Sequence, residues 1–409
     1  MTVKNDPDFE YYLKPPREQV FYKGMAITMT FLRLANSSWW DLPPTLKLLK
    51  IHGDMFLIVA PICLSLQVLY LYVYFNELTF TTLGTMFSMI PATLVVNVKL
   101  LVSMRTAYKQ IMCNLMDKIH IYNFLDDNDD FIKMKLLKVE RNTRWLTTFL
   151  VSFILMDWLL WSVIPLRNNI INKDRIANRT IRLETCLYMW MPFDYGYEFR
   201  TWLITHAMNV YLVFTGGLVL SFNDSNNFIF IFHFLGHVDI LRHKMRTYFT
   251  VKLNDIDTKG KIVELIKYHS FILSTFKDME AGFGANVTLN YLQNLLNDSL
   301  LLYQIMVGDK ANRLTYLFMM QFHMGGLIVM SFALEQIRIK TEDLALDLYQ
   351  VPWENMSTSN QKLLIPILLR MQTPLVFEGA LGLQTGVRPL ASIIKSTFSY
   401  YVMLKSSIE

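Results

Sequence analysis

Long uncharged stretches dominate the pattern of hydrophobic and polar positions along this chain. The charge-free stretches are 55–76, 78–98, 201–223 and 314–334. A further stretch, 145–166, holds one charged side chain, Asp157. The hydrocarbon core of a bilayer takes about 20 apolar helical residues to cross. Lipid offers the backbone no hydrogen-bond partner, so segments of this kind cross it as helices. The pattern therefore predicts an all-α, polytopic membrane protein.

Seven crossings are expected once two less regular segments are added. The expected helices are 53–76, 78–103, 140–166, 198–223, 286–308, 312–335 and 374–404, and the fourth is expected to continue past Asn223 into the Phe-rich stretch 228–234. The fifth is unusually polar, because it carries Asn286, Asn290, Asn294 and Asp298. Either it is buried inside a bundle, or its lower part projects below the membrane. Segments 1–50, 224–285 and 336–373 then lie outside the membrane, and the last two have helical periodicity typical of an interaction module.

The loops differ in basic residues, and this difference predicts the orientation. Lys and Arg are concentrated in 1–50, 104–144, 224–285 and 335–362, all on one side of the predicted membrane. The positive-inside rule places this side, and the N-terminus, in the cytoplasm. Seven crossings put the C-terminus outside. The outer loop carries the sequon Asn178-Arg179-Thr180, so we predict Asn178 as a glycosylation site.

The closing helix is the best candidate for a functional element. Ser392, Ser396, Ser399 and Met403 are spaced four, three and four residues apart and form one stripe. Hydroxyls that end in an apolar side chain suit the wall and the hydrophobic gate of a pore. Small residues that let two helices approach closely would leave the same pattern. The residues alone favour neither interpretation.

A second set of candidates lies in the outer half of the predicted bundle, where aromatic and Met side chains mix with a few polar groups. Such a mixture suits a pocket for an apolar small molecule, although each residue alone fits a helix core equally well. The set comprises Phe80, Phe87, Phe153, Asp157, Trp158, Trp161, His206, Met208, Asn209, Tyr211, Tyr303, Tyr316, Met320 and His323. For Asp157, an intramembrane carboxyl that is costly to bury, a hydrogen bond between helices is the favoured interpretation.

Enzyme chemistry has no support in the sequence. His233 and His237 are four residues apart, as metal ligands on a helix would be, but no third ligand is convincingly placed. No phosphate loop, zinc-protease motif or nucleophile elbow occurs. Three cysteines allow one disulfide at most. We expect no catalysis, no cofactor, no metal and no nucleic-acid partner.

Residues of the carboxy-terminal third resemble the signature of insect odorant receptors. These residues are Tyr349-Gln350-Val351-Pro352-Trp353, Lys362-Leu363-Leu364, Leu369-Arg370-Met371-Gln372-Thr373-Pro374, Gly379, and Lys395 to Leu404 with its Ser399-Tyr400 pair. Met191-Pro192-Phe193-Asp194 in the outer loop and the chain length of 409 residues also match.

The resemblance implies a tetrameric, ligand-gated cation channel of the sensory-neuron plasma membrane. It implies that a coreceptor subunit completes the heterotetramer, that cytoplasmic anchor helices make most subunit contacts, and that the seventh helices line the pore. Met403 would form the gate. A volatile odorant would bind among helices 2, 3, 4 and 6 with part of 5. Coreceptors are longer, so the chain resembles an odorant-tuning subunit.

Three other classes of protein remain as alternatives. A gustatory-type contact chemoreceptor would work without the coreceptor. A G-protein-signalling receptor would have its N-terminus outside. A transporter is disfavoured because no internal repeat is found. The aromatic and Met-rich set favours an ester, alcohol or terpenoid ligand over a carboxylic acid, because the set contains no Arg or Lys.

Overall fold

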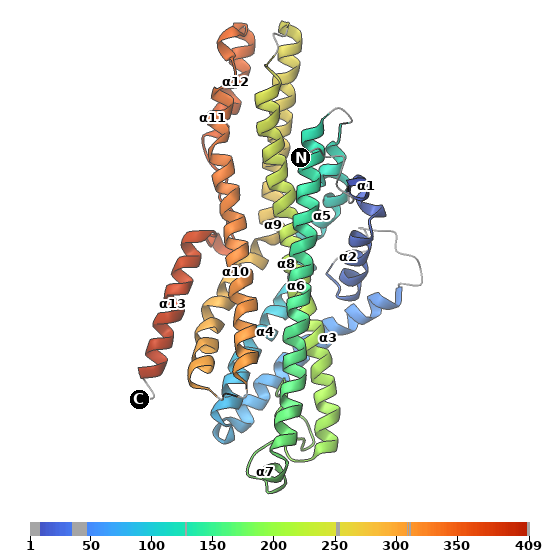
Figure 1. Ribbon diagram of the computed structural model, residues 1–409, viewed down its shortest axis with the longest axis vertical. Coiled ribbons are helices and arrows are strands. Elements are labelled where there is room, and N and C mark those ends of the chain that lie inside the picture. Colours follow the sequence, from blue (N-terminus) through green and yellow to red (C-terminus); the bar gives the residue numbers. More distant parts are fainter. Residues whose placement is uncertain are drawn as a thin grey trace.

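The protein is an elongated bundle of helices that run nearly parallel to its long axis (Figure 1). The computed structural model describes residues 9–34, 47–126, 129–250, 254–308, 310 and 312–406. The main helices are α3 (Lys47–Tyr74), α4 (Phe80–Ser103), α6 (Asp130–Ile171), α8 (Phe199–Thr247), α9 (Asp255–Val307), α10 (Arg313–Glu342), α12 (Thr358–Met371) and α13 (Val387–Ser406). Shorter helices are α1 (Phe9–Tyr12), α2 (Val20–Phe31), α5 (Thr106–Asn114), α7 (Lys173–Ala177) and α11 (Leu344–Tyr349).

Five helical segments of the described chain are long and apolar enough to cross a membrane. They are Leu48–Glu77, Thr82–Ser103, Asp130–Ile171, Phe199–Thr247 and Arg313–Asn355. The predicted fifth and seventh crossings, in α9 and α13, are more polar than these. In α9 the polar side chains are turned inward: Asn286, Asn297 and Asp298 are fully buried. Polarity in α9 therefore belongs to the interior of the bundle.

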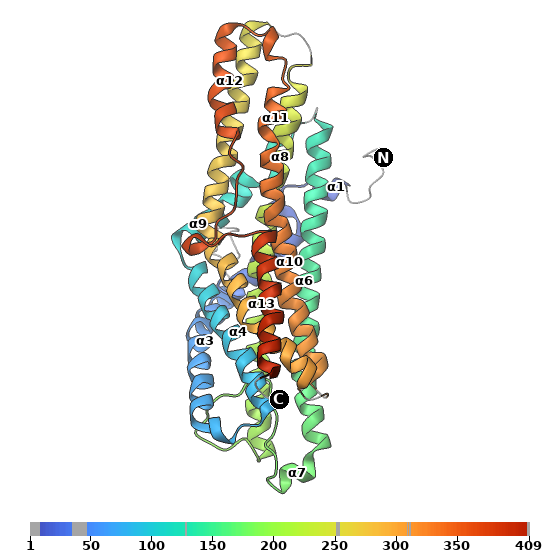
Figure 2. The same cartoon turned by 90° about the vertical axis from the view of Figure 1, so that its left-hand side faces the viewer.

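Three helices are much longer than a bilayer requires. α6 has 42 residues, α8 has 49 and α9 has 53. At about 1.5 Å per residue, such helices exceed the roughly 30 Å hydrocarbon thickness about twofold or more. They continue toward the end of the molecule that also holds α11 and α12, whereas α7 and the C-terminus lie toward the opposite end (Figures 1 and 2). The predicted crossing 286–308 is thus the last part of a helix that starts at Asp255.

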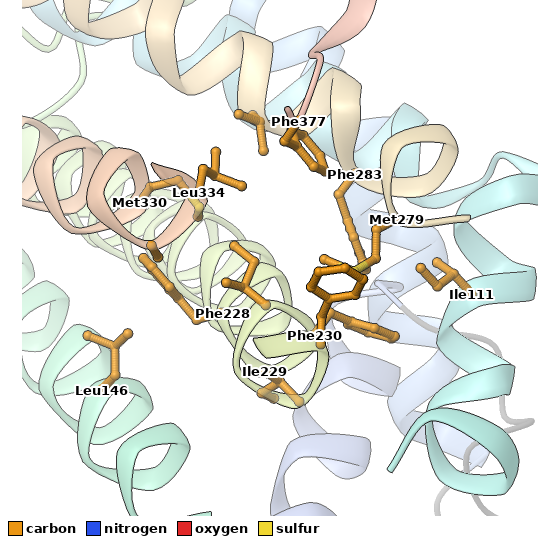
Figure 3. Close-up of a cluster of buried hydrophobic side chains, with 14 of the residues drawn as sticks. Ile111, Leu146, Phe228, Ile229, Phe230, Met279, Phe283, Met330, Leu334 and Phe377 are labelled. Atoms are coloured by element: carbon orange, nitrogen blue, oxygen red, sulfur yellow. The ribbon is translucent and has the colours of Figure 1, made fainter. Parts of the chain in front are cut away.

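A cluster of aromatic side chains joins α8 to α9 in the middle of the molecule (Figure 3). Phe228 and Phe230 of α8 are buried, and the Phe230 ring lies 4.8 Å from the ring of Phe283 on α9. Gly282 faces Ile111 of α5, where a Cβ would come within 2.7 Å of the Ile111 side chain. Close approach of α5 and α9 therefore depends on this glycine. The Phe-rich stretch 228–234 belongs to the core of the bundle.

The closing helix is shorter than the predicted span 374–404. Residues between α12 and α13 form an irregular link in which Gly382 and Gly386 have φ of +71° and +107°. The Gly386 N–H donates to the Tyr291 hydroxyl of α9 at 2.9 Å, and a Cβ at Gly386 would come within 2.6 Å of Glu335. Positive φ and this close approach both require glycine. α13 therefore begins only at Val387.

Candidate functional site: an apolar cavity among five helices

A cavity of about 90 Å³ lies in the half of the bundle nearer the C-terminus. It is enclosed by α3, α4, α6, α8 and α10 together with Leu187 of the outer loop. The lining residues are Phe56, Ala60, Cys63, Met89, Ala92, Thr93, Val96, Ile154, Asp157, Trp158, Trp161, Leu187, Leu212, Val213, Gly216, Gly217, Leu220, Met319 and His323. Aliphatic, aromatic and Met side chains form most of this wall, which suits an apolar ligand.

Small residues leave the space that the cavity occupies. Ala60, Ala92, Gly216 and Gly217 come from three neighbouring helices, and none fills the volume that a larger side chain would take. A Cβ at Gly216 would make only ordinary contact, 3.6 Å from Val96. Larger side chains at these positions would close the cavity. The cavity therefore depends on small residues as much as on the aromatic ones.

Polar groups of Trp158, Asp157 and His323 are among those that interrupt the apolar wall. The Trp158 indole N–H donates to the backbone carbonyl of Val210 at 3.0 Å and is thereby satisfied. Asp157 is buried, and its Oδ1 has no hydrogen-bond partner. The Gln293 amide of α9 donates to Nδ1 of His323 at 2.7 Å. The neutral His323 ring then carries its proton on Nε2, so it can offer a hydrogen-bond donor to a ligand.

A largely buried ion pair lies close to the cavity. Lys99 of α4 donates to Asp224 of α8 at 2.8 Å, and Asn290 of α9 donates to the same carboxylate at 2.9 Å. These three side chains and His323 line a second, smaller cavity of about 20 Å³. Sequence reasoning did not select Lys99, because a single Lys at the end of an apolar stretch usually extends to the membrane surface. Here it fastens α4, α8 and α9 together.

Four of the predicted ligand-binding residues lie in the cavity wall: Asp157, Trp158, Trp161 and His323. Tyr316 lies next to this group, since its ring makes an edge-to-face contact with Trp161 at 6.0 Å. Tyr316 itself faces a different cavity, on the outer side.

The other predicted residues lie elsewhere in the described chain. Phe87, Met208 and Tyr211 are exposed on the surface of the bundle, while Phe153, Tyr303 and Met320 pack between helices. His206 and Asn209 are buried and fasten the outer loop: His206 contacts the Thr185 hydroxyl, and Asn209 donates to the Leu187 carbonyl at 2.6 Å. Phe80 begins α4, and its side chain lies outside the described residues.

The sequence did not indicate that α3 contributes to the wall of the cavity. Phe56, Ala60 and Cys63 line the cavity, whereas α9 supplies none of its lining residues. The sequence did contain one signal for the cavity itself, the Gly216-Gly217 pair in the middle of an apolar helix. Glycine in a helix is less stable than alanine by about 1 kcal/mol, so a pair of glycines there needs a packing reason.

The serine–methionine stripe of α13 faces away from the rest of the chain. Ser392, Ser399 and Met403 are exposed, and Ser396 is half-buried. The opposite face, with Leu390, Ile393 and Thr397, is buried against the bundle. Most of the stripe therefore lies on the outer surface of the single chain. Asn178, the predicted glycosylation site, is exposed at the end of α7.

His233 packs beside a hydrogen-bonded cluster of His120, Glu140 and Tyr22, and all four residues are fully buried. Tyr22 donates to Glu140 at 2.9 Å, and His120 Nε2 lies 2.8 Å from the same oxygen. The His233 ring lies 4.2 Å from the His120 ring, and backbone N–H groups donate to Nδ1 of both histidines, at 3.2 Å for His120 and 3.4 Å for His233. In the neutral rings Nε2 then carries the proton; Nε2 of His120 faces the Glu140 carboxylate, whereas Nε2 of His233 has no hydrogen-bond partner.

Burial is the main reason that the pKa of Tyr22 lies well above its usual range, and the Glu140 carboxylate adds to it. The cluster joins α2 to α6 and to α8. His237 is also buried and contacts the Tyr268 hydroxyl at 2.7 Å. The predicted pair His233 and His237 thus takes part in helix packing.

Fold and composition together define a polytopic helical membrane protein with an apolar cavity among its helices. A family model, 7tm Odorant receptor, matches residues 79–398. The chain therefore belongs to the 7tm odorant receptor family.

Individual relatives share the fold at low sequence identity. Odorant receptor 30a of Drosophila melanogaster is 21% identical over 170 residues, 41% of this chain and 44% of that protein, so the alignment spans less than half of the curated relative. The olfactory receptor OR5 of Machilis hrabei has a TM-score of 0.75 at 12% identity, covering 97% of this chain and 99% of that one. The structure of OR5 in complex with eugenol has a TM-score of 0.74 at 12% identity, covering 98% of this chain and 100% of that one.

Proposed function

We propose that this chain is the odour-sensing subunit of a ligand-gated, nonselective cation channel. The subunit assembles with the odorant receptor coreceptor as a heterotetramer in the plasma membrane of a sensory neuron, with its N-terminus in the cytoplasm. The observation that carries the proposal is the enclosed apolar cavity in a chain of the odorant receptor family. The exposed serine–methionine stripe of α13 supports a pore-lining role.

The ligand is an apolar volatile with one oxygen-bearing group, such as an ester, an alcohol or a terpenoid. Ring and Met side chains take up its hydrocarbon part, and His323 donates to its oxygen. OR5 of Machilis hrabei, which shares this fold, was solved in complex with eugenol. An apolar cavity of about 150 Å³ takes up benzene. A cavity of about 90 Å³ therefore has to widen for most odorants, and Met89 and Met319 are flexible enough to allow it.

Widening of the cavity provides the link to gating. A ligand shifts a conformational equilibrium only if it binds one state better than the other. A cavity that fits the odorant poorly when contracted and well when expanded has this property. The expanded bundle then favours an outward position of α13 and an open gate at Met403.

Patch-clamp recording with and without the coreceptor tests the proposal. Cells that express both chains should carry odorant-evoked cation current, and cells with this chain alone should carry none. Strong current from the chain alone would support the gustatory-type alternative. An N-terminal tag labelled from outside intact cells would support a G-protein-signalling receptor and contradict the proposed orientation.

Met403→Ser tests the gate separately. Replacing an apolar constriction by a hydroxyl favours wetting of the closed pore, so ligand-free current should rise. Ser392→Ala, at the other end of the stripe, is the control and should leave ligand-free current unchanged. If Met403→Ser leaves both leak and gating as in the unmodified chain, Met403 is not the gate.

A further inference from the structure

A third and larger cavity lies on the outer side of the 90 Å³ cavity, which we call the inner cavity. Its volume is about 390 Å³, and it lies between the outer loop and the ends of α4, α6 and α10. Glu77, Thr79, Arg175 and Thr180 at its rim are exposed to solvent. We call this cavity the outer vestibule. None of the residues predicted from the sequence, apart from Trp161 and Tyr316, lines it.

Trp161 separates the two cavities, because it lines both of them. Its ring meets the edge of the Tyr316 ring at 6.0 Å, and the Tyr316 hydroxyl lies 2.9 Å from the Thr85 hydroxyl. These three buried side chains come from α6, α10 and α4. One aromatic contact and one hydrogen bond therefore span the partition, and a change of side-chain rotamer would open it.

The walls of the vestibule suit a molecule that is mostly apolar but carries one polar group. Leu78, Ile164, Ile181 and Leu183 supply apolar surface, and hydroxyl and amide groups lie between them. Thr315 also lines the vestibule, is buried, and has no hydrogen-bond partner for its hydroxyl. A buried hydroxyl without a partner is unfavourable, so an oxygen-bearing ligand would gain by contacting it.

The outer loop closes over the vestibule through Arg182. Its guanidinium forms an ion pair with Glu77 at 2.5 Å and lies over the Tyr74 ring at 4.5 Å. The loop is thus fixed to the turn that joins α3 to α4. A fixed roof and an exposed rim make the vestibule a preformed entrance, whereas the side-chain partition below it is the movable part.

We propose that the outer vestibule is a first binding site for the odorant, and that Trp161, Tyr316 and Thr85 form a door through which the odorant passes into the inner cavity. The inference rests on the proposed function, since it concerns the same ligand. Trp161 lines the inner cavity, but Tyr316 and Thr85 do not. A door residue that does not contact the ligand in the inner cavity changes the rates of entry and exit by the same factor, so its replacement leaves the affinity nearly unchanged. Tyr316 and Thr85 are therefore the positions that distinguish a door from a ligand-contacting residue.

Tyr316→Phe is the first test, because it keeps the ring and removes the hydroxyl that meets Thr85. Loss of one hydrogen bond should speed both the onset and the decay of odorant current at subsaturating concentration by about fivefold. The concentration for half-maximal current should stay within about twofold. Thr85→Val should act in the same way. A shift in that concentration without faster kinetics, or no change at all, would overturn the inference.

Thiol labelling tests the route independently of the door. Ile181→Cys places a thiol in the vestibule, and Asp174→Cys places one on exposed α7 outside it. A membrane-impermeant, charged thiol reagent applied from outside should slow the onset of odorant current in Ile181→Cys only. The unmodified chain controls for Cys63, Cys113 and Cys186. Equal onset before and after labelling of Ile181→Cys would mean that odorant enters through the lipid, and the inference would be wrong.

Failure of the inference and failure of the proposed function give different results. Odorant current with unchanged kinetics in every variant would overturn the entry route alone. Absence of odorant current in the unmodified chain with the coreceptor, at confirmed surface expression, would overturn the proposed function and the inference together.

Discussion

His323 shows how one neighbouring side chain sets the chemistry of an otherwise apolar wall. Its Nδ1 accepts from Gln293 at 2.7 Å, so Nε2 is the atom that carries the proton. A donor in an apolar surrounding selects ligands that carry an acceptor oxygen. Asp157, on the facing part of the wall, is buried without an ionic partner, and a charged carboxylate there would be costly. At this scale the wall of the cavity suits a neutral ligand better than a charged one.

His323→Phe should discriminate between ligands that differ only in an acceptor oxygen. The half-maximal concentration of an oxygen-bearing odorant should rise about fivefold, the effect of one hydrogen bond, while that of a hydrocarbon of similar shape should not. Dose–response curves of odorant current give both values. Met320→Leu, on the same helix but outside the cavity wall, is the matched control. Equal shifts for both ligands would mean that His323 contributes shape alone.

The helices themselves were largely predictable from hydrophobic periodicity, but their full length was not. Uncharged stretches near 55–76 and 201–223 predict helices because the bilayer demands about 20 apolar residues. The Phe-rich stretch 228–234 predicts that the fourth helix continues past Asn223, and α8 does continue, but its last part up to Thr247 carries no such signal. The irregular link before α13 was also missed, because it depends on a contact of Gly386 with Glu335 that is distant in sequence.

Prediction of the site was harder than prediction of the helices, because the site also depends on contacts between residues distant in sequence. A cavity forms where side chains are too small to fill the space, and small residues such as Ala60, Ala92 and Gly216 have no functional group that marks them in the sequence. Aromatic residues were recognised, yet on a lipid-facing helix half of them point outward, as Phe87 and Tyr211 do. The face that each helix turns to its neighbours is set by packing, which a single sequence does not specify.

The stability of the packing between α9 and α12 should decrease in mild acid. Burial, with a smaller effect of the Arg370 guanidinium, lowers the pKa of His269 to about 4. In the unfolded chain this pKa is about 6.5. The neutral ring therefore contributes stability that is complete above about pH 6.5 and is lost as the pH falls toward 4.

The thermal midpoint of the purified protein should accordingly fall between pH 7.5 and pH 5, and His269→Gln should reduce this fall. The largest contribution that such a difference in pKa represents is about 3 kcal/mol. His243→Gln, at a ring stacked on Phe131, is the control. The same pH dependence in the unmodified chain and in His269→Gln would contradict the assignment to His269.

At the scale of the whole molecule, the single chain leaves apolar surface exposed where it projects from the membrane. Leu346, Tyr349, Ile365 and Leu369 of α11 and α12 are all more than half exposed. Apolar patches on such a projecting element are typical of protein interfaces. Such a patch is available for contact with another protein chain, and α13 lies at one side of the bundle (Figure 1).

Leu369→Glu should weaken assembly without unfolding the chain, because the side chain is exposed in the subunit. Burying an unpaired charge in an interface is unfavourable, so co-purification with the coreceptor should drop by about tenfold. Ser359→Glu, exposed on the same helix, should co-purify like the unmodified chain. Unchanged co-purification of Leu369→Glu would place the subunit contact elsewhere.

The central claim is that an odorant opens the channel from within the inner cavity, and one pair of glycines tests it most directly. Gly216 lines the cavity, whereas a Cβ at Gly325 of α10 would meet nothing within 4 Å. Whole-cell current is measured against odorant concentration in coreceptor-expressing cells for Gly216→Leu and Gly325→Leu at matched surface expression. We predict that Gly216→Leu raises the half-maximal concentration at least about tenfold, equivalent to about 1.4 kcal/mol, and that Gly325→Leu leaves it unchanged. Identical dose–response curves for Gly216→Leu and the unmodified chain would show that the odorant acts from another site.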